Sequence, residues 1–374
     1  MTRTRLDIHL DRIQTNVTAL RQLYGKRGIA ITAITKGVCG DPEVARALVR
    51  GGIRSLGDSR LENLRRMREA GVQAEYMLVR PPPPSRAAEV VALADVSLNS
   101  EPEVVRLLAA EAQATGRVHG VILMVEGGDL REGLLPEELP AAVTQIAPLK
   151  GIQLRGVGMN LVCLNGVVPT DEAMWALSRL VERTERETGV PLPVVSGGNS
   201  GNHLWLMNTQ DVRRINHLRI GEAILLGHES VRRQHIEGLA EDAFSLVGEV
   251  IEVRCKPSRP RGPRARNAIG LLPERADLGT IRRAIVALGE QDVARGALHP
   301  CVDAQIVGIS SDVLVLHDRT GRIRVGDEVP FEIDYGTLLR AMTSPYVAKR
   351  YHTRRGTMGP LSASRPSGGH AVAH

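Results

Sequence analysis

The amino-acid sequence predicts an α/β protein, a (β/α)8 barrel of the TIM type followed by a C-terminal all-β domain. Short apolar runs alternate with amphipathic helical patterns about eight times between residues 28 and 230. Such alternation builds a parallel sheet, either closed as a barrel or open and doubly wound, and eight units favour the barrel. After about residue 240, β-rich runs are separated by Gly, Pro and Asp turns with hardly any helical pattern.

The barrel elements follow from two periodicities. Strands are expected where short apolar or β-branched runs occur, at 30–35, 53–57, 74–79, 95–99, 120–126, 152–159, 192–197 and 215–221. Helices are expected where apolar residues recur at i, i+3 and i+4 with charges between them, as at 42–51, 59–71, 101–116 and 170–189.

These patterns divide the chain into a barrel at 1–238, a β domain at 239–352 and a tail at 353–374. A strand at 4–10 is a candidate member of the β domain. The tail lacks an apolar period and is expected to be disordered. The Arg/Pro-rich stretch 256–278 is expected to be a long loop, and the sequence assigns it no role.

Composition excludes several classes of protein. The chain of 374 residues has no run of about 18 apolar residues and no apolar segment at its start, so neither a membrane span nor a secretory signal is expected. The four cysteines lack CxxC spacing, which argues against a zinc site or disulfide scaffold and favours the cytoplasm. The net charge is +6, but aromatic residues make up 2%, so nucleic-acid binding is not expected.

One lysine stands where the first barrel strand ends. In "ITAITKGVCG" (31–40) the apolar and β-branched run contains Lys36, followed at once by glycines. A lysine in such a run is ordinarily paired, chemically modified or at the strand's end. Barrel enzymes build their active sites at the carboxyl ends of the strands, so Lys36 is a candidate for chemistry there.

Glycine-rich loops follow the last two barrel strands. "SGGNSGN" (196–202) and "RIGEA" (219–223) suit a phosphate site, because glycines let backbone N–H groups approach an anion. A lysine facing a phosphate pocket suggests a cofactor held as a Schiff base.

Several motifs, in order along the chain, now carry a resemblance. They are "LDIHLDRIQTN" (6–16), "TKGVCGDPEVA" (35–45), "GDSRLENL" (57–64), "SLNSEPEV" (97–104), "GDLREG" (128–133), "SGGNSGN", "HLRIGEAILLGHE" (217–229) and "YGTLLRAMTSPYV" (335–347). The chain resembles the fold-type III enzymes dependent on pyridoxal 5′-phosphate (PLP), the alanine racemase family, and most of all its ornithine racemase branch.

The resemblance implies roles for individual residues. Lys36 would hold PLP as a Schiff base and act as a base at the substrate Cα. Arg219 would face the pyridine nitrogen and keep it unprotonated, which favours simple proton return over side reactions. Arg131 would lie near the phenolate oxygen, and Asn160 stands where the family commonly has a histidine packed on the ring.

The resemblance also implies the phosphate ligands. These would be Ser200, the backbone N–H groups of Gly221 and Glu222, and Tyr346.

Two departures from the family leave the second acid/base open. Where the family has a tyrosine after a β-domain turn, "ALGEQDV" (287–293) places Glu290, and "ISSD" (309–312) replaces the family's "CMD" and places Asp312. Further candidates for this role are Gln291, Asp292, Ser310 and Tyr335. Our hypothesis is that some of these carboxylates instead bind the distal ammonium of a basic substrate.

The resemblance therefore implies a PLP-dependent racemase that interconverts the L and D forms of ornithine or another basic amino acid. The implied assembly is a cytoplasmic homodimer with shared active sites, with a small-molecule substrate and neither nucleic acid nor membrane as a partner. No metal is expected. The alternatives are a racemase of alanine or other amino acids, a lyase similar to D-threonine aldolase, and a non-catalytic PLP-binding protein.

Overall fold

The structure is a computed structural model that describes residues 4–267, 270, 272–274, 276–294, 298–353 and 356–358. Its first part is a closed parallel barrel, which confirms the predicted fold class. The barrel strands are β2 (Ala30–Ile34), β3 (Ser55–Asp58), β4 (Glu75–Leu78), β5 (Val96–Asn99), β6 (His119–Val125), β7 (Ile152–Met159), β8 (Val194–Ser196) and β9 (His217–Ile220), and β9 pairs with β2.

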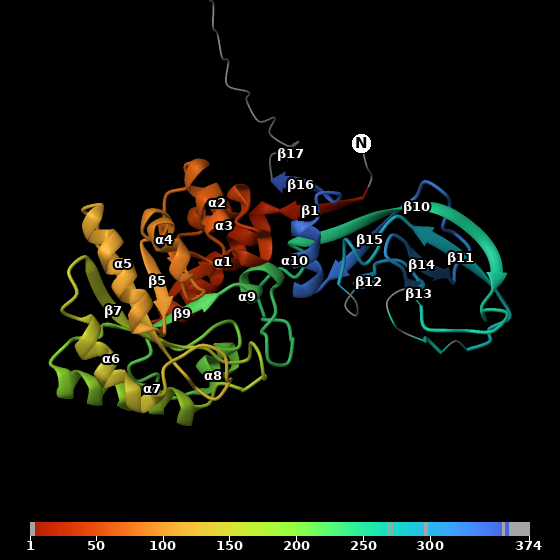
Figure 1. Ribbon diagram of the computed structural model, residues 1–374. Helices are drawn as coiled ribbons and strands as arrows, with labels where there is room; N and C mark the ends of the chain where they lie inside the picture. The colour runs from red at the N-terminus through yellow and green to blue at the C-terminus, as the bar shows by residue number, and fades with distance from the viewer. Residues whose placement is uncertain are drawn as a thin grey trace, which may run out of the picture.

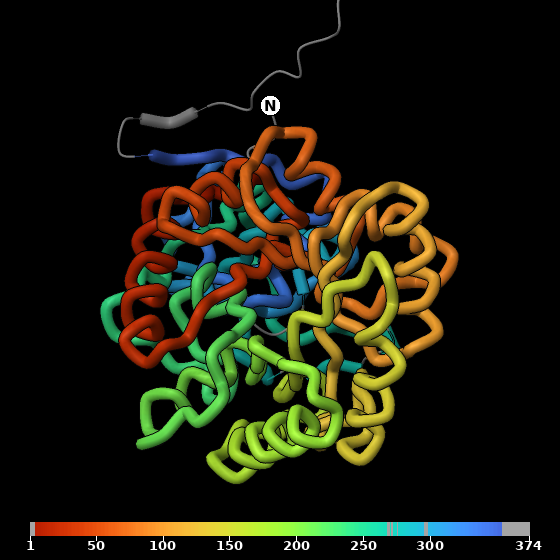
Figure 2. Tube along the Cα trace, turned by 90° about the vertical axis from the view of Figure 1, so that its left-hand side faces the viewer, coloured from red at the N-terminus to blue at the C-terminus, as the bar shows by residue number. Residues whose placement is uncertain are grey.

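Helices surround these strands as a ring (Figure 2). They are α1 (Leu10–Gly25), α2 (Pro42–Arg50), α3 (Leu61–Glu69), α4 (Ala87–Leu93), α5 (Pro102–Ala114), α6 (Leu139–Ile146), α7 (Asp171–Thr188), α8 (Asn202–Asn208) and α9 (Glu222–Leu226), with 3-10 turns η1 (Lys36–Val38), η2 (Pro84–Arg86) and η3 (Pro136–Glu138). Local signals set their ends. The Asp41 carboxylate accepts from the N–H groups of Glu43 and Val44 at the start of α2, and Gly189 ends α7 at a φ of 71°.

A second, mainly antiparallel sheet lies beside the barrel (Figure 1). Its strands are β1 (Arg5–His9), β10 (Phe244–Pro257), β11 (Thr280–Val286), β12 (Leu298–Pro300), β13 (Ala304–Ile309), β14 (Leu314–Asp318), β15 (Glu328–Ile333), β16 (Ala348–Thr353) and β17 (Gly356–Met358). The N-terminal β1 pairs with β10 and β16, so this segment belongs to the second sheet although α1 follows it at once.

Two predicted segments lie partly outside the described residues. The Arg/Pro-rich stretch 256–278 begins within β10, and residues 268, 269, 271 and 275 are not described. In the stretch 353–374, for which disorder was predicted, Thr353 ends β16 and Gly356–Met358 form β17, whereas 354, 355 and 359–374 lie outside the described residues.

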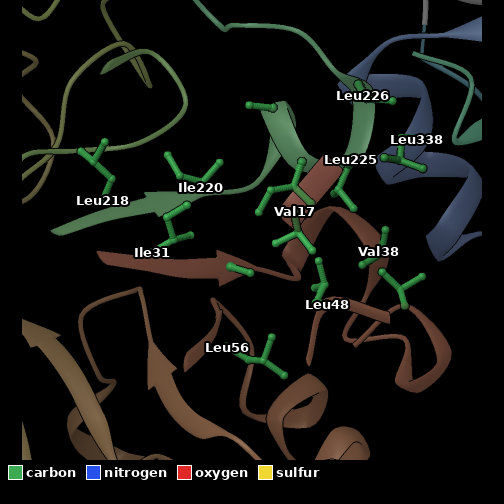
Figure 3. Packing of buried hydrophobic residues seen from close by; sticks show 14 of the residues in the cluster. Val17, Ile31, Val38, Leu48, Leu56, Leu218, Ile220, Leu225, Leu226 and Leu338 are labelled. Carbon is green, nitrogen blue, oxygen red and sulfur yellow. The ribbon is translucent and has the colours of Figure 1, made fainter. Parts of the chain in front are cut away.

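One helix within the second part was not predicted. Helix α10 (Tyr335–Thr343) begins where the Asp334 carboxylate accepts from the N–H of Thr337 at 2.8 Å. It packs against η1, and its Leu338 joins the same hydrophobic cluster as Val38 and Leu225 of the barrel (Figure 3). The helix therefore ties the second part of the chain to the barrel beside Lys36.

Within the described residues, no helix is both long and apolar enough to cross a membrane.

Candidate active site

A cavity of about 330 Å³ opens at the mouth of the barrel, where the carboxyl ends of the strands meet. All but one of the residues predicted to bind the cofactor line it, namely Lys36, Arg131, Asn160, Ser200, Arg219, Gly221 and Glu222. These residues come from five separate segments of the sequence. The fold therefore brings the predicted set together in one place.

Lys36 begins η1, directly after β2, and its side chain is half-buried. Among the described residues its ammonium has no hydrogen-bond or ion-pair partner. The turn that carries it is fixed on both sides. The Thr35 hydroxyl donates to the buried Asp58 carboxylate at 2.7 Å, and a Cβ at Gly37 would lie 2.8 Å from the Tyr335 ring. A glycine is therefore needed beside the lysine for this tyrosine to pack there.

Arg219 ends β9 and is only 4% exposed. Its guanidinium donates to the Ser196 hydroxyl, to the Met159 carbonyl at 2.7 Å and to Asn160 Oδ1 at 3.4 Å. Among the described residues it has no carboxylate within ion-pair distance. Burial lowers the pKa of Arg219 to about 10, so the group stays positively charged at neutral pH.

A histidine lies beneath this arginine inside the barrel. The Ser196 hydroxyl also contacts His217 Nδ1 at 2.7 Å, and His217 Nε2 contacts the Thr32 hydroxyl at 2.9 Å. Burial lowers the pKa of His217 to about 3, so the imidazole is neutral and Arg219 does not face a second cation there.

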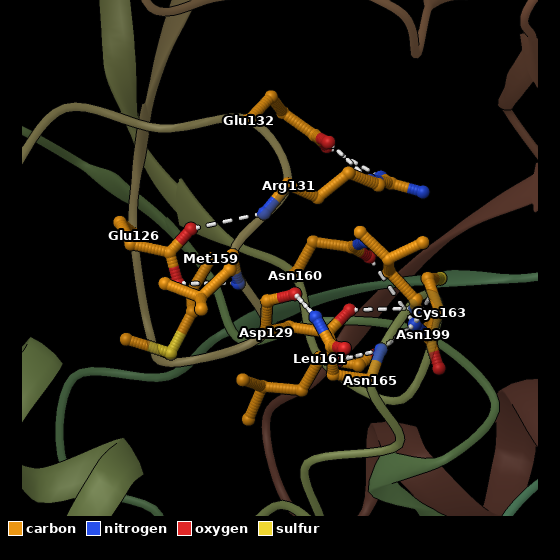
Figure 4. Close-up of polar contacts among 12 residues, drawn as sticks. Glu126, Asp129, Arg131, Glu132, Met159, Asn160, Leu161, Cys163, Asn165 and Asn199 are labelled. Carbon is orange, nitrogen blue, oxygen red and sulfur yellow. Dashed lines mark hydrogen bonds and ion pairs between the residues drawn. The ribbon is translucent and has the colours of Figure 1, made fainter.

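Asn160 carries an unpartnered group. Its Oδ1 accepts from Asn199 Nδ2 at 3.2 Å and from Arg219, but its buried Nδ2 has no partner among the described residues (Figure 4). A buried N–H donor without an acceptor costs free energy, so its presence at a cavity wall points to a ligand acceptor atom.

Two carboxylates shape the loop that presents Arg131. The Glu126 carboxylate accepts from the N–H groups of Leu130 and Arg131, at 3.0 and 3.2 Å. The Asp129 carboxylate accepts from the N–H groups of Leu164 and Asn165, at 2.9 and 3.0 Å, and so couples this loop to the one after β7 (Figure 4).

The Arg131 guanidinium pairs with Glu132, which lines the same cavity. Sequence reasoning had assigned Glu132 no role, although it follows Arg131 directly.

Elsewhere in the cavity wall, the Ser200 hydroxyl accepts from the N–H groups of Gly221 and Ala223, at 3.3 and 3.2 Å. The neighbouring Glu222 carboxylate accepts from the Ser230 hydroxyl at 2.7 Å. Among the described residues Glu222 has no cationic partner. The cavity therefore contains one carboxylate that is already paired with an arginine, Glu132, and one that is not.

Tyr346, predicted to hold a phosphate, is 68% exposed and does not line the cavity of its own chain. Tyr335, eleven residues earlier, lines it instead. The prediction placed the tyrosine from the motif alone, whereas the turn of α10 directs Tyr335 onto Gly37. Burial raises the pKa of the Tyr335 phenol above its usual value.

Glu290 and Asp312 also lie away from this cavity. Their turns lie side by side in the second sheet, since the N–H of Glu290 donates to the Ser310 carbonyl at 2.9 Å. Asp312 is exposed and accepts from the Ser310 hydroxyl at 2.9 Å. The two departures from the family pattern thus form one patch of the second domain.

Further side chains that line the cavity had been assigned no role, among them Cys163, Asn199, Ser230 and Arg233. Ser230 and Arg233 lie in a turn beyond the last barrel strand. No pattern in the sequence indicates that this turn folds back over the mouth of the barrel.

The residues present fit an anionic, aldehyde-bearing ring such as PLP. Within the part of the chain that the structure describes, one cavity is lined by a lysine amine, a buried arginine with no carboxylate partner and an amide N–H with no acceptor. Positive charge and hydrogen-bond donors predominate at its walls, which suits a phosphorylated cofactor rather than a cationic one.

Comparisons with known proteins agree with this geometry. The family described as the alanine racemase N-terminal domain matches residues 8–229. A lysine racemase from Thermotoga maritima is 39% identical over 350 residues, covering 93% of this chain and 98% of the relative. An ornithine racemase from Acetoanaerobium sticklandii is 33% identical over 349 residues, covering 92% and 98%.

Solved structures share the fold at lower identity. The alanine racemase of Clostridium difficile superposes with a TM-score of 0.73 at 18% identity, covering 96% of this chain and 98% of that one. D-threo-3-hydroxyaspartate dehydratase from Delftia sp. HT23 superposes with a TM-score of 0.71 at 18% identity, covering 96% of each chain.

Proposed function

The chain belongs to the alanine racemase family and is a PLP-dependent amino acid racemase, and we propose that its substrates are basic amino acids, ornithine and lysine. The two relatives above that align over almost their entire length are named for these substrates. The observation that carries the proposal is Glu222, a carboxylate at the cavity wall that no cation among the described residues neutralises.

We propose the following roles for the barrel residues. Lys36 holds the cofactor through its amine and, when the substrate takes its place, accepts the α-proton at Nζ. Arg219 faces the ring nitrogen, and its contacts with Met159 and Ser196 hold it there. Bound PLP withdraws electrons from the Cα–H bond. Arg131, Asn160, Ser200, Gly221 and Glu222 orient the cofactor through side chains or backbone N–H groups.

A basic substrate needs a negatively charged partner for its distal ammonium. Glu132 is paired with Arg131, so transferring it to a substrate would cost that ion pair. The Glu222 carboxylate accepts from the neutral Ser230 hydroxyl, so it can bind an ammonium without giving up an ion pair. We therefore assign the distal ammonium to Glu222. The sequence also offered Glu290, Asp292 and Asp312 for this contact, but Glu222 is a carboxylate that lines the cavity of the same chain.

Racemisation needs a second proton carrier on the face opposite Lys36. We propose that the chain is a homodimer in which the turn of Glu290 and Asp312 enters the partner's site. In support, Glu290 and Asp312, the two positions at which the sequence departs from the family pattern, lie in adjacent turns that do not line the cavity of their own chain. Tyr335 is the alternative carrier, since it lines that cavity itself.

A cytoplasmic location is proposed on separate grounds. All four cysteines are unpaired in the structure, which suits a reducing compartment.

The substrate proposal is tested by chiral chromatography of the PLP-loaded enzyme with L-ornithine, L-lysine and L-alanine. Higher kcat/KM for the two basic amino acids is expected. Equal or better turnover of alanine would contradict the assignment to basic substrates. Cleavage of a β-hydroxy amino acid without racemisation would identify a lyase instead.

A further inference from the structure

A short hairpin follows α9 and carries two histidines side by side. His228 and His235 form an antiparallel β-bridge, and their rings meet edge-on with centroids 6.4 Å apart. The hairpin is closed by backbone hydrogen bonds from Glu229 N to Gln234 O at 3.0 Å and from Ile236 N to Gly227 O at 2.8 Å. The two imidazoles therefore stand on a fixed backbone.

A buried carboxylate holds the turn between them. Glu229 is 1% exposed and accepts from the N–H groups of Val231, Arg232 and Gln234, at 2.7, 2.8 and 3.0 Å. These three bonds satisfy the acid within the hairpin itself. Glu229 thus preorganises the loop and is not a candidate ligand.

The third group comes from the segment that leads into β10. Glu241 Oε1 lies 2.5 Å from His228 Nε2 and 3.3 Å from His235 Nδ1. Its neighbour Ala240 is anchored on both sides by the buried Asn16 of α1, whose Nδ2 donates to the Ala240 carbonyl at 2.8 Å and whose Oδ1 accepts from the Ala240 N–H at 2.6 Å. Glu241 is therefore held against the hairpin from outside it.

We propose that His228, His235 and Glu241 bind one divalent transition-metal ion, with Zn²⁺ the best match. Within the residues that the structure describes, this is the one group of three His, Cys, Asp or Glu side chains whose ligand atoms lie within 4.8 Å of one another. Two imidazoles and one carboxylate are a common zinc ligand set, and a water molecule fills the fourth position. Two ligand atoms of a tetrahedral zinc site are roughly 3.3 Å apart. His235 Nδ1 and Glu241 Oε1 already have this spacing, whereas the 2.5 Å hydrogen bond between His228 Nε2 and Glu241 Oε1 has to open when the ion binds.

The hairpin links the proposed metal site to the active-site cavity. None of its three ligands lines the cavity, but Ser230 and Arg233 of the same hairpin do. Ser230 donates to Glu222, and Arg233 lies 3.8 Å from Asp334 at the start of α10. A bound ion would fix the hairpin to the β10 segment and so hold these two residues over the cavity. The metal site itself does not depend on which amino acid is the substrate.

Sequence reasoning expected no metal. Cysteine spacing carries no information about this site, because its ligands are two histidines and a glutamate. The β-bridge and the Asn16 anchor bring them together, and neither is visible in the spacing of the residues.

The test uses the PLP-loaded protein, stripped of metal with a chelator and titrated with Co²⁺, whose absorption reports tetrahedral coordination. One ion per chain is expected, displaced by Zn²⁺. His228→Ala, His235→Ala and Glu241→Gln should each weaken binding at least about tenfold. His299→Ala, an exposed histidine of β12, is the matched control and should bind as wild type does.

Circular dichroism verifies that each variant is folded before titration. Zn²⁺ should also raise the melting temperature of the wild type by more than that of His235→Ala, because the wild type gains more binding free energy in the folded state. No saturable Co²⁺ binding by the wild type, or equal affinity in the wild type and both histidine variants, would overturn the proposal.

Discussion

The mouth of the barrel and the turns of the second sheet contribute to the site in different ways. At the barrel mouth, Arg219 is 4% exposed and held by three acceptors that come from β7, the loop after it and β8. In the second sheet, exposed Asp312 contacts the hydroxyl of Ser310, two residues earlier. The cofactor side is thus fixed by the folded barrel, whereas the second proton carrier, as we propose it, depends on how two chains assemble.

Removing the barrel lysine should have the largest effect. Lys36→Ala is expected to lower kcat by about 10⁴-fold or more, because the same amine holds the cofactor and moves the proton. Borohydride treatment followed by peptide mass spectrometry should label Lys36 in the wild type. The exposed Lys26→Ala serves as control and should retain wild-type activity. Labelling of another lysine would contradict the assignment.

Removing the second proton carrier should have the next largest effect. If the partner's turn supplies it, Glu290→Gln or Asp312→Asn should lower kcat by about 10²-fold, within the range for one general acid/base. Mixing that variant with Lys36→Ala should restore part of the activity, since one site of the mixed dimer would contain both wild-type groups. Tyr335→Phe should then be the milder change.

The opposite pattern of activities would contradict our proposal that the second sheet supplies the second proton carrier. Loss of racemisation in Tyr335→Phe, with both carboxylate variants active, would mean that the chain's own cavity carries both protons.

The distal-ammonium contact should have a smaller effect, confined to basic substrates. Glu222→Gln is expected to raise KM for ornithine about tenfold, since one charge-assisted contact is weakened, and to leave KM for alanine unchanged. Glu132→Gln is the matched control, because Glu132 also lines the cavity. An ornithine KM that rises only in Glu132→Gln would move the contact to the Arg131 loop.

The barrel interior should also make the fold sensitive to acid. Burial lowers the pKa of His119 to about 4 and that of His217 to about 3, below their usual value of 6.5 in the unfolded chain. The unfolded state therefore binds more protons than the folded state at acid pH. The stabilisation of the fold that follows from these neutral histidines is complete above pH 6.5 and falls progressively as the pH drops toward 4. The loss at His119 is about 3 kcal/mol in the free energy of unfolding.

Urea unfolding of the wild type and His119→Gln at several pH values measures this effect. A flatter pH dependence is expected in the variant, and identical slopes would contradict it.

Much of the barrel could be predicted from the sequence because each unit carries its own signals. Asp41 before Pro42 and Gly189 after α7 mark helix ends locally, and Lys36 stands at a strand end. The carboxyl ends of all strands lie at the same end of a barrel. Residues predicted from separate motifs therefore line one cavity.

The rest depended on long-range packing. Tyr335 enters the cavity through α10, a short helix whose burial against η1 has no counterpart in the local pattern. The hairpin carrying Ser230 and Arg233 keeps its shape over the mouth because the Glu229 carboxylate accepts from the backbone N–H groups of its turn. The pairing of the Glu290 and Asp312 turns likewise arises from the register of the second sheet.

The most direct test of the central claim is α-proton exchange in D₂O, followed by NMR, with the PLP-loaded enzyme and L-ornithine, L-lysine or L-alanine. We expect loss of the α-proton of ornithine and lysine with parallel growth of their D forms, and no exchange in Lys36→Ala. Exchange without inversion would mean that Lys36 works without a second carrier. No exchange with ornithine or lysine would contradict the account.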